Sequence, residues 1–139
     1  MDDAQKTWAD YQQRKKQERL AEAPQVWKQL RAAGATDETI LALDFVHFGS
    51  SRSPVEALAR QLSEHYEVKI KADETNSGYC LLEGTTRPYG VTLTEQAHLQ
   101  WVEFMADVAQ SHGCVFSRWV VEAPSLKVRS ESDRAGDAN

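Results

Sequence analysis

Residues 38–48 read Glu-Thr-Ile-Leu-Ala-Leu-Asp-Phe-Val-His-Phe and contain neither glycine nor proline. Their β-branched and aromatic side chains predict a β-strand. Leu41, Leu43 and Phe45 would face one side of that strand, and Val46 and Phe48 the other. A strand that is apolar on both faces usually lies in the centre of a sheet and is covered on both sides. This stretch therefore predicts a central strand.

The residues that follow predict five further elements. Ser53 and Glu56 have capping-box spacing around Pro54, which predicts a helix start. Residues 66–71 alternate as an edge strand does, and turn residues at 73–78 join them to a second strand at 79–84. Residues 92–95 repeat the capping-box spacing and open a helix over 93–111. Residues 114–121 predict a last strand, which the proline at 124 would end.

This order of strand, helix, strand, strand, helix, strand predicts an α+β fold of the ferredoxin-like βαββαβ type. Right-handed crossovers would place both helices on one face of a four-stranded antiparallel sheet, with its first and third strands in the middle. The other face then lacks a cover. The N-terminal helix, a second copy of the chain in a homodimer, or a different protein could supply it.

We divide the chain into three parts. Residues 1–37 are expected to form an N-terminal helical extension, interrupted near Glu22 and Ala23 because Pro24 lacks an N–H group. Residues 38–124 form the ferredoxin-like domain. Residues 125–139 are expected to be a mobile polar tail.

The chain of 139 residues has a formal net charge of -5, with 41% hydrophobic and 27% charged residues. Residues 1–34 carry seven basic and five acidic side chains, whereas residues 35–126 carry six basic and 13 acidic ones. An acidic body argues against direct nucleic-acid binding, which needs clustered Lys and Arg. Apolar runs are too short for a membrane-spanning helix, and the N-terminus is charged, so we expect a cytoplasmic protein without a membrane partner.

The titratable residues do not form a recognisable catalytic pattern. The four histidines are scattered without metal-ligand spacing, so we expect no metal and no cofactor. Cys80 and Cys114 would lie on the third and fourth strands with the first strand between them, and we expect them to be unbonded. No phosphate-binding glycine loop is present. We therefore expect a protein that is not an enzyme and has no catalytic residues.

Four segments carry a resemblance to a known family. Residues 25–34 (QVWKQLRAAG) and 43–48 (LDFVHF) are similar to the opening helix and first strand of the bacterial family named regulator of ribonuclease E activity B. Residues 54–62, which lead to Tyr66-Glu67-Val68, resemble its next helix and strand. Residues 113–119 resemble its closing strand, which carries a tryptophan, here Trp119. The resemblance covers residues 24–123.

The resemblance implies a ferredoxin-like protein that binds ribonuclease E, or a related RNA-degrading endonuclease, and lowers its activity by contact. Two alternatives stay open: an immunity or antitoxin-like protein that neutralises a toxin, and a small-ligand sensor on the same fold. Trp119 is either a core residue or a partner anchor. The candidate partner-binding residues are Asp44, His47, Tyr79, Arg118 and Trp119.

Overall fold

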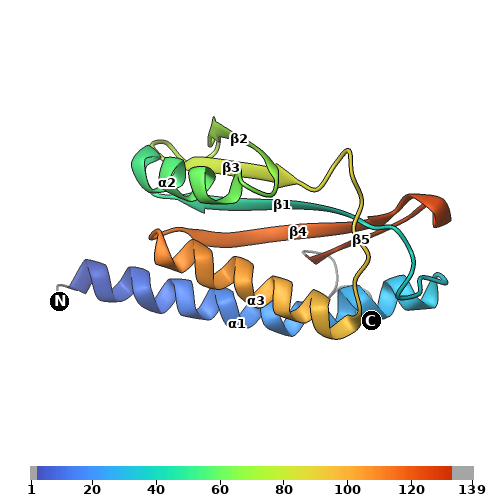
Figure 1. The fold of residues 1–139 in the computed structure, drawn as a ribbon. Coiled ribbons are helices and arrows are strands. Elements are labelled where there is room, and N and C mark those ends of the chain that lie inside the picture. The colour runs from blue at the N-terminus through green and yellow to red at the C-terminus, as the bar shows by residue number, and fades with distance from the viewer. Residues whose placement is uncertain (1–2, 133–139) are drawn as a thin grey trace.

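The computed structural model describes residues 3–132, which form three α-helices and a single five-stranded sheet (Figure 1). The elements in chain order are α1 (Asp3–Ala32), β1 (Ala42–Gly49), α2 (Arg52–Leu62), β2 (Glu67–Ala72), β3 (Cys80–Thr85), α3 (Glu95–Ser111), β4 (Val115–Ala123), a 3-10 turn (Pro124–Leu126) and β5 (Val128–Glu131).

The strand order is β2-β3-β1-β4-β5, and every neighbouring pair is antiparallel. β1 lies between β3 and β4, which confirms the central position expected from residues 38–48, although the strand starts at Ala42. β1 and β3 both lie inside the sheet and β2 lies at an edge, as the sequence predicts. The expected number of four strands is wrong, because β5 adds a fifth strand beside β4.

The fifth strand comes from the segment that we expected to be a mobile tail. Lys127 adopts a left-handed conformation with φ of 55° and turns the chain back along β4. Two buried serines anchor the returning strand. The hydroxyl of Ser130 lies 2.6 Å from Gln29 Oε1, and that of Ser132 accepts a hydrogen bond from the Trp119 backbone N–H at 3.0 Å. Residues 133–139 of the expected tail lie outside the described residues.

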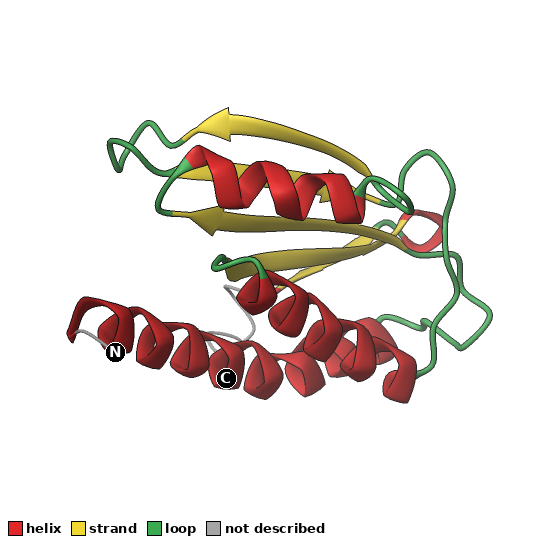
Figure 2. Ribbon diagram, turned by 60° about the vertical axis from the view of Figure 1, so that its left-hand side comes forward, coloured by secondary structure: helices red, strands yellow, loops and turns green. Residues whose placement is uncertain are grey.

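Helices cover one face of the sheet (Figure 2). α2 packs against β1, β2 and β3, while α3 packs against β4 and α1. The apolar stripe of α2, which consists of Val55, Leu58, Ala59 and Leu62, is buried, but the predicted caps are wrong. α2 has Ser51 at its N-cap instead of Ser53, and α3 has Thr94 instead of Thr92. Thr94 Oγ1 accepts a hydrogen bond from the Ala97 N–H at 3.1 Å and so satisfies a free donor of the first turn.

α1 is one continuous helix, so the break expected at Pro24 is wrong. Pro24 itself is exposed, whereas Ala23, Val26, Trp27 and Leu30 are buried on both sides of it. Their packing against the rest of the core outweighs the loss of one backbone hydrogen bond. Tertiary contacts therefore carry the helix through a residue that would end it locally.

Side chains of α1 also seal part of one sheet edge. β5 pairs only with residues 120–123 of β4, so the first half of β4 has β1 on one side and no strand on the other. There, Trp8 Nε1 donates to the carbonyl oxygen of Gly113 at 3.1 Å and Gln12 Nε2 to that of Cys114 at 2.8 Å. Arg19 donates to the carbonyl oxygen of Ser117. α1 thus satisfies acceptors that a further strand would otherwise satisfy.

The buried residues of α1, of α2 and α3 and of the sheet form one continuous hydrophobic cluster. Both cysteines belong to it as free thiols, which confirms that they are unbonded. Burial raises the pKa of the Cys114 thiol to about 11, so it stays protonated at neutral pH.

Candidate functional site

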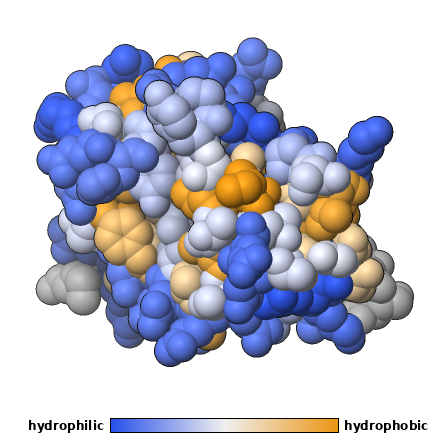
Figure 3. All heavy atoms as spheres, turned by 45° about the vertical axis from the view of Figure 1, so that its right-hand side comes forward, coloured by the Kyte–Doolittle hydropathy of each residue, from blue (hydrophilic) through white to orange (hydrophobic). Residues whose placement is uncertain are grey.

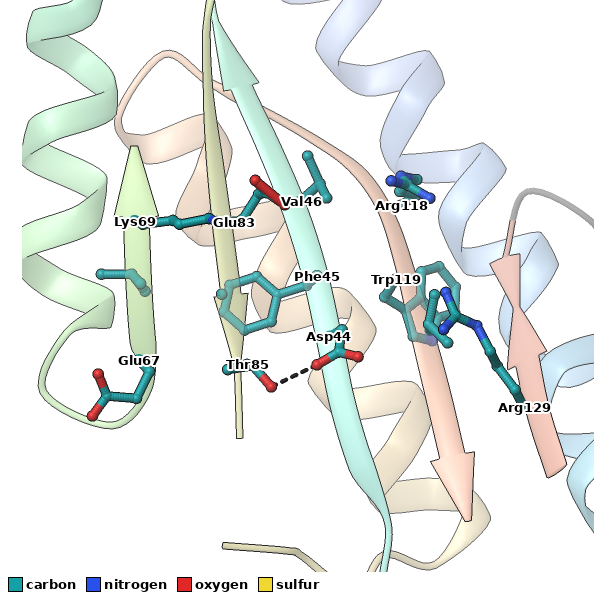
Figure 4. Close-up of a pocket in the computed structure, with 13 residues that line it drawn as sticks. Asp44, Phe45, Val46, Glu67, Lys69, Glu83, Thr85, Arg118, Trp119 and Arg129 are labelled. Carbon is teal, nitrogen blue, oxygen red and sulfur yellow. Dashed lines mark hydrogen bonds between the residues drawn. The ribbon is translucent and has the colours of Figure 1, made fainter. Parts of the chain in front are cut away.

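The sheet face turned away from the helices is the candidate site, and we call it the open face. Its side chains come from alternate residues of the same strands that build the core. The strand register aligns one row of them across four strands: Lys69 on β2, Glu83 on β3, Val46 on β1 and Arg118 on β4. Figure 4 shows these side chains along the sheet, with Arg129 reaching in from β5.

The open face is hollowed by a concavity of about 540 Å³. Asp44, Val46, Glu83 and Val120 line its middle, and charged residues from β2, β4 and β5 line its sides. Val46 and Val120 give the concavity an apolar floor. The surroundings are polar, so this is an open hollow with charges of both signs around a small apolar centre.

Ion pairs connect several strands across this face. Asp44 accepts a hydrogen bond from Thr85 Oγ1 and lies 3.3 Å from Arg87 Nε (Figure 4 draws the first). Arg87 also lies 3.3 Å from Glu122, and its hydrogen bond with Asp44 raises the pKa of the guanidinium. Lys71 lies 2.9 Å from Glu83. These contacts hold the carboxylates of Asp44, Glu83 and Glu122 in fixed positions.

Three other charges on the face are free. Lys69, Glu67 and Arg118 are exposed and form no ion pair or hydrogen bond with another residue of the range 3–132. Lys69 and Arg118 lie in the same row on either side of Glu83 and Val46. The face therefore presents two unpaired cations that flank an apolar floor.

Of the predicted partner-binding residues, Asp44 and Arg118 lie on the open face. Tyr79 precedes β3, stacks on Phe48 at one end of the sheet, and lines a different hollow from that of Asp44 and Arg118. His47 and Trp119 are corrected, since both are 0% exposed on the core face and no partner reaches them in this fold. Trp119 donates from Nε1 to His98 Nε2 at 3.2 Å, which settles its role as a core residue.

The two buried histidines belong to the core as well. Burial lowers the pKa of His47 to about 3 and that of His98 to about 4, so both rings are neutral at neutral pH. Neither ring nitrogen of His47 has a hydrogen-bond partner within residues 3–132, and the ring packs 5.0 Å from Phe116 and 5.5 Å from Phe45. Proton transfer at the open face cannot use these two residues.

Several residues of the site were not predicted. Lys69 could have been found from the alternation of residues 66–71, which sends Lys69 and Lys71 to the same side. Arg129 could not, because it belongs to the unexpected fifth strand.

Within residues 3–132 no group of three or more His, Cys, Asp or Glu residues is arranged to hold a metal ion. None of the described helices is long and apolar enough to cross a membrane.

The exposed apolar surface is divided into small patches. Ile40, Leu99, Phe104 and Leu126 are each at least 38% exposed; Leu99 and Phe104 lie on α3, Ile40 precedes β1, and Leu126 lies in the 3-10 turn. Phe104 is thus turned toward solvent, although the helix on which it lies packs against the core. Figure 3 shows such patches as isolated orange areas among hydrophilic residues.

The chain matches no protein-family model, and comparison with curated proteins gives no match.

Proposed function

We propose that this protein is a regulatory protein without catalysis of its own, which binds a protein partner through the open face. The observation that carries the proposal is the uncovered sheet face, where Lys69, Glu67 and Arg118 surround an apolar floor without partners of their own. Free charges around an apolar centre are the arrangement of many protein interfaces, which have a hydrophobic core and a polar rim.

We further infer a ferredoxin-like core. The order β2-β3-β1-β4, with α2 joining β1 to β2 and α3 joining β3 to β4, supports this classification. α1 and β5 would then be additions to that core. Both lie beside β4 and leave the middle of the open face free.

The proposed partner is ribonuclease E or a related endonuclease of the bacterial cytoplasm. This choice rests on the resemblance of residues 24–123 to regulators of ribonuclease E activity B. Contact with the enzyme would lower its rate of RNA cleavage without any chemical step on this chain. The two free cations of the open face would pair with carboxylates of the partner.

The test is RNA cleavage by purified ribonuclease E with increasing amounts of this protein, together with a direct binding measurement. We expect saturable binding and a lower cleavage rate. Because charges at an interface set specificity and association rate, we expect the double variant Lys69→Glu/Arg118→Glu to weaken binding at least about tenfold. Both substitutions lie on exposed positions, so the melting temperature should stay close to that of the parent.

Lys28→Glu is the matched control. Lys28 is exposed on α1, outside the open face, and forms no ion pair within the described residues. The single charge reversal there should leave binding and inhibition unchanged. The proposal of this partner is wrong if the parent protein neither binds ribonuclease E nor changes its rate. The proposal of the open face is wrong if binding occurs and the double variant retains it.

A further inference from the structure

A second hollow lies at the end of the sheet where α1 begins. It has a volume of about 810 Å³ and shares no lining residue with the concavity of the open face. One wall is the first turns of α1, and the other is the turn between β2 and β3. Figures 1 and 2 place these two segments at the same end of the molecule.

Four partly exposed aromatic side chains line this groove in a continuous row. Trp8 stacks on Tyr11 with ring centroids 5.7 Å apart, and Trp8 meets Phe48 edge to face at 6.4 Å. Phe48 in turn stacks on Tyr79 at 6.0 Å. The row therefore runs from α1 across the end of β1 to the start of β3. We call it the aromatic row.

The aromatic row is held in place before any ligand arrives. The hydrogen bond from Trp8 Nε1 to Gly113 and that from Gln12 to Cys114 fix α1 against the start of β4. Lys16 adds an ion pair with Asp107 on α3 at 2.7 Å. A preformed aromatic surface loses little conformational freedom when it binds, and this raises the affinity that it can reach for a short peptide.

The charges of the groove select among ligands. Asp73 lies directly beside Tyr79, to which its backbone N–H is bonded at 3.0 Å. Its carboxylate accepts hydrogen bonds from the Thr75 backbone N–H and from the side chain and backbone N–H of Asn76, which lower its pKa, and no Lys or Arg of residues 3–132 pairs with it. Asp3 is a second carboxylate of the lining, and Arg14 is its one cation, placed 5.6 Å above the Tyr11 ring.

Two carboxylates and one cation in the lining disfavour the binding of a nucleic acid. Stacked bases would suit the rings, but a phosphate backbone needs several cations along its path. The lining offers Arg14 alone and opposes it with two carboxylates. Lys15 lies 5.4 Å from the centroid of the Tyr11 ring but is paired with Glu18 at 3.0 Å. The same charges favour a basic peptide, because Asp73 and the face of the Tyr79 ring both attract a cation.

We propose that the groove binds an extended, proline-containing segment of another protein that carries a lysine or arginine beside the prolines. The proline rings would pack on Trp8 and Phe48, and the cation would reach Asp73 and Tyr79. Proline-rich segments dock in aromatic-lined grooves because their extended helix is formed beforehand. Its rise of about 3.1 Å per residue lets roughly four residues follow the aromatic row. This site is separate from the proposed ribonuclease contact.

Calorimetric titration of the full chain with a ten-residue proline-rich peptide that has one central lysine tests the proposal. We expect saturable binding, with an affinity typical of short peptides, in the range of about 10 µM to 1 mM. The same peptide with glutamate in place of lysine should bind at least about fivefold more weakly, because it meets Asp73 with a like charge. Ten-nucleotide oligouridylate should not bind.

Variants then assign the binding to the groove. Tyr79→Ala should weaken peptide binding about tenfold, since it removes an aromatic contact. Asp73→Asn keeps the Oδ1 acceptor of the turn but loses the hydrogen bond from Asn76 Nδ2 to Oδ2. With a melting temperature equal to that of the parent, it should weaken binding about threefold. Glu74→Gln is the matched control, because it changes the same charge on the neighbouring residue of the same turn, which does not line the groove.

The proposal is overturned if the lysine peptide does not bind, or if the lysine and glutamate peptides bind equally. It is also overturned if oligouridylate binds more tightly than the peptide, or if Asp73→Asn and Glu74→Gln have the same effect. Melting temperatures of the variants show whether each still folds. If Tyr79→Ala does not fold, the comparison of Asp73→Asn with Glu74→Gln decides the result.

Discussion

Arg118 and Trp119 are neighbours on β4, yet they belong to opposite faces of the sheet. Trp119 is 0% exposed and packs against Phe116 with ring centroids 5.5 Å apart, while Arg118 is exposed and has no partner within residues 3–132. The same contrast separates Phe45 from Asp44 on β1. Each strand thus supplies one residue to the core and the next to the open face.

The difference shows that the two faces are stabilised by different interactions. The core face depends on shape, since closely packed aromatic and aliphatic side chains lose contacts when any one is altered. The open face depends on charges held in water, which contribute little to the free energy of unfolding. Stability therefore resides in one face, and the other is free to serve recognition.

The largest change in the free energy of unfolding is expected from Trp119→Ala. Removing a fully buried tryptophan leaves a cavity and costs about 3–5 kcal/mol of the free energy of unfolding. Arg118→Ala on the adjacent residue should change it by no more than about 0.5 kcal/mol. Urea unfolding of both variants measures the two values. Similar losses in both would contradict the assignment of the two faces.

The next effect concerns pH. The folded pKa of His47 is about 3, below the ordinary value of 6.5, so between these values the unfolded chain binds a proton that the folded protein does not. The free energy of unfolding therefore falls as the pH drops below 6.5. At pH 4.5 the loss is roughly 2 to 3 kcal/mol for this residue, and it continues toward pH 3.

His47→Leu should remove that loss. The variant should be at least as stable as the parent at pH 7.5, because the His47 nitrogens have no partners, and clearly more stable at pH 4.5. Unfolding curves at the two pH values give the comparison, and the exposed His65→Leu is the control. Parallel pH profiles for His47→Leu and the parent would show that His47 is charged or accessible in the folded protein.

A smaller effect is expected from Gly84→Ala on β3. A Cβ atom at this position would lie 2.2 Å from the Phe45 ring, so the ring has to move within a packed core. We expect a loss of about 1–2 kcal/mol. The control is Gly113→Ala, where no atom lies within 4 Å and only the φ of 72° opposes the substitution. Thermal unfolding of both variants separates the cost of overpacking from that of backbone strain, and an unchanged melting temperature for Gly84→Ala would contradict the close approach.

The smallest effect is expected from Arg87→Ala. Arg87 pairs with Asp44 and Glu122 on the open face while its side chain is 43% exposed. Pairs of this kind contribute about 0.2–1 kcal/mol, and salt screens them. The difference in the free energy of unfolding between Arg87→Ala and the parent should therefore be smaller in 1 M NaCl. A loss of several kcal/mol that salt leaves unchanged would mean that the open face does contribute to stability.

The sequence alone determined the elements whose cause is local. Alternation in residues 66–71 and the apolar stripe of α2 reflect which side of each element is buried, and this pattern is visible in the chain itself. The apolar character of residues 38–48 on both faces correctly placed β1 in the centre of the sheet. The order of these elements was sufficient to place β1 and β3 inside and β2 at an edge.

The tertiary structure decided what depends on contacts between distant residues. β5 is held in the sheet because its buried serines form hydrogen bonds with Gln29 and with the Trp119 backbone. No local pattern in residues 125–132 predicts these contacts. Pro24 continues its helix because packing on both sides compensates for one missing hydrogen bond. His47 and Trp119 face the core and Arg118 faces solvent because of strand register, since a shift of one residue exchanges the two faces.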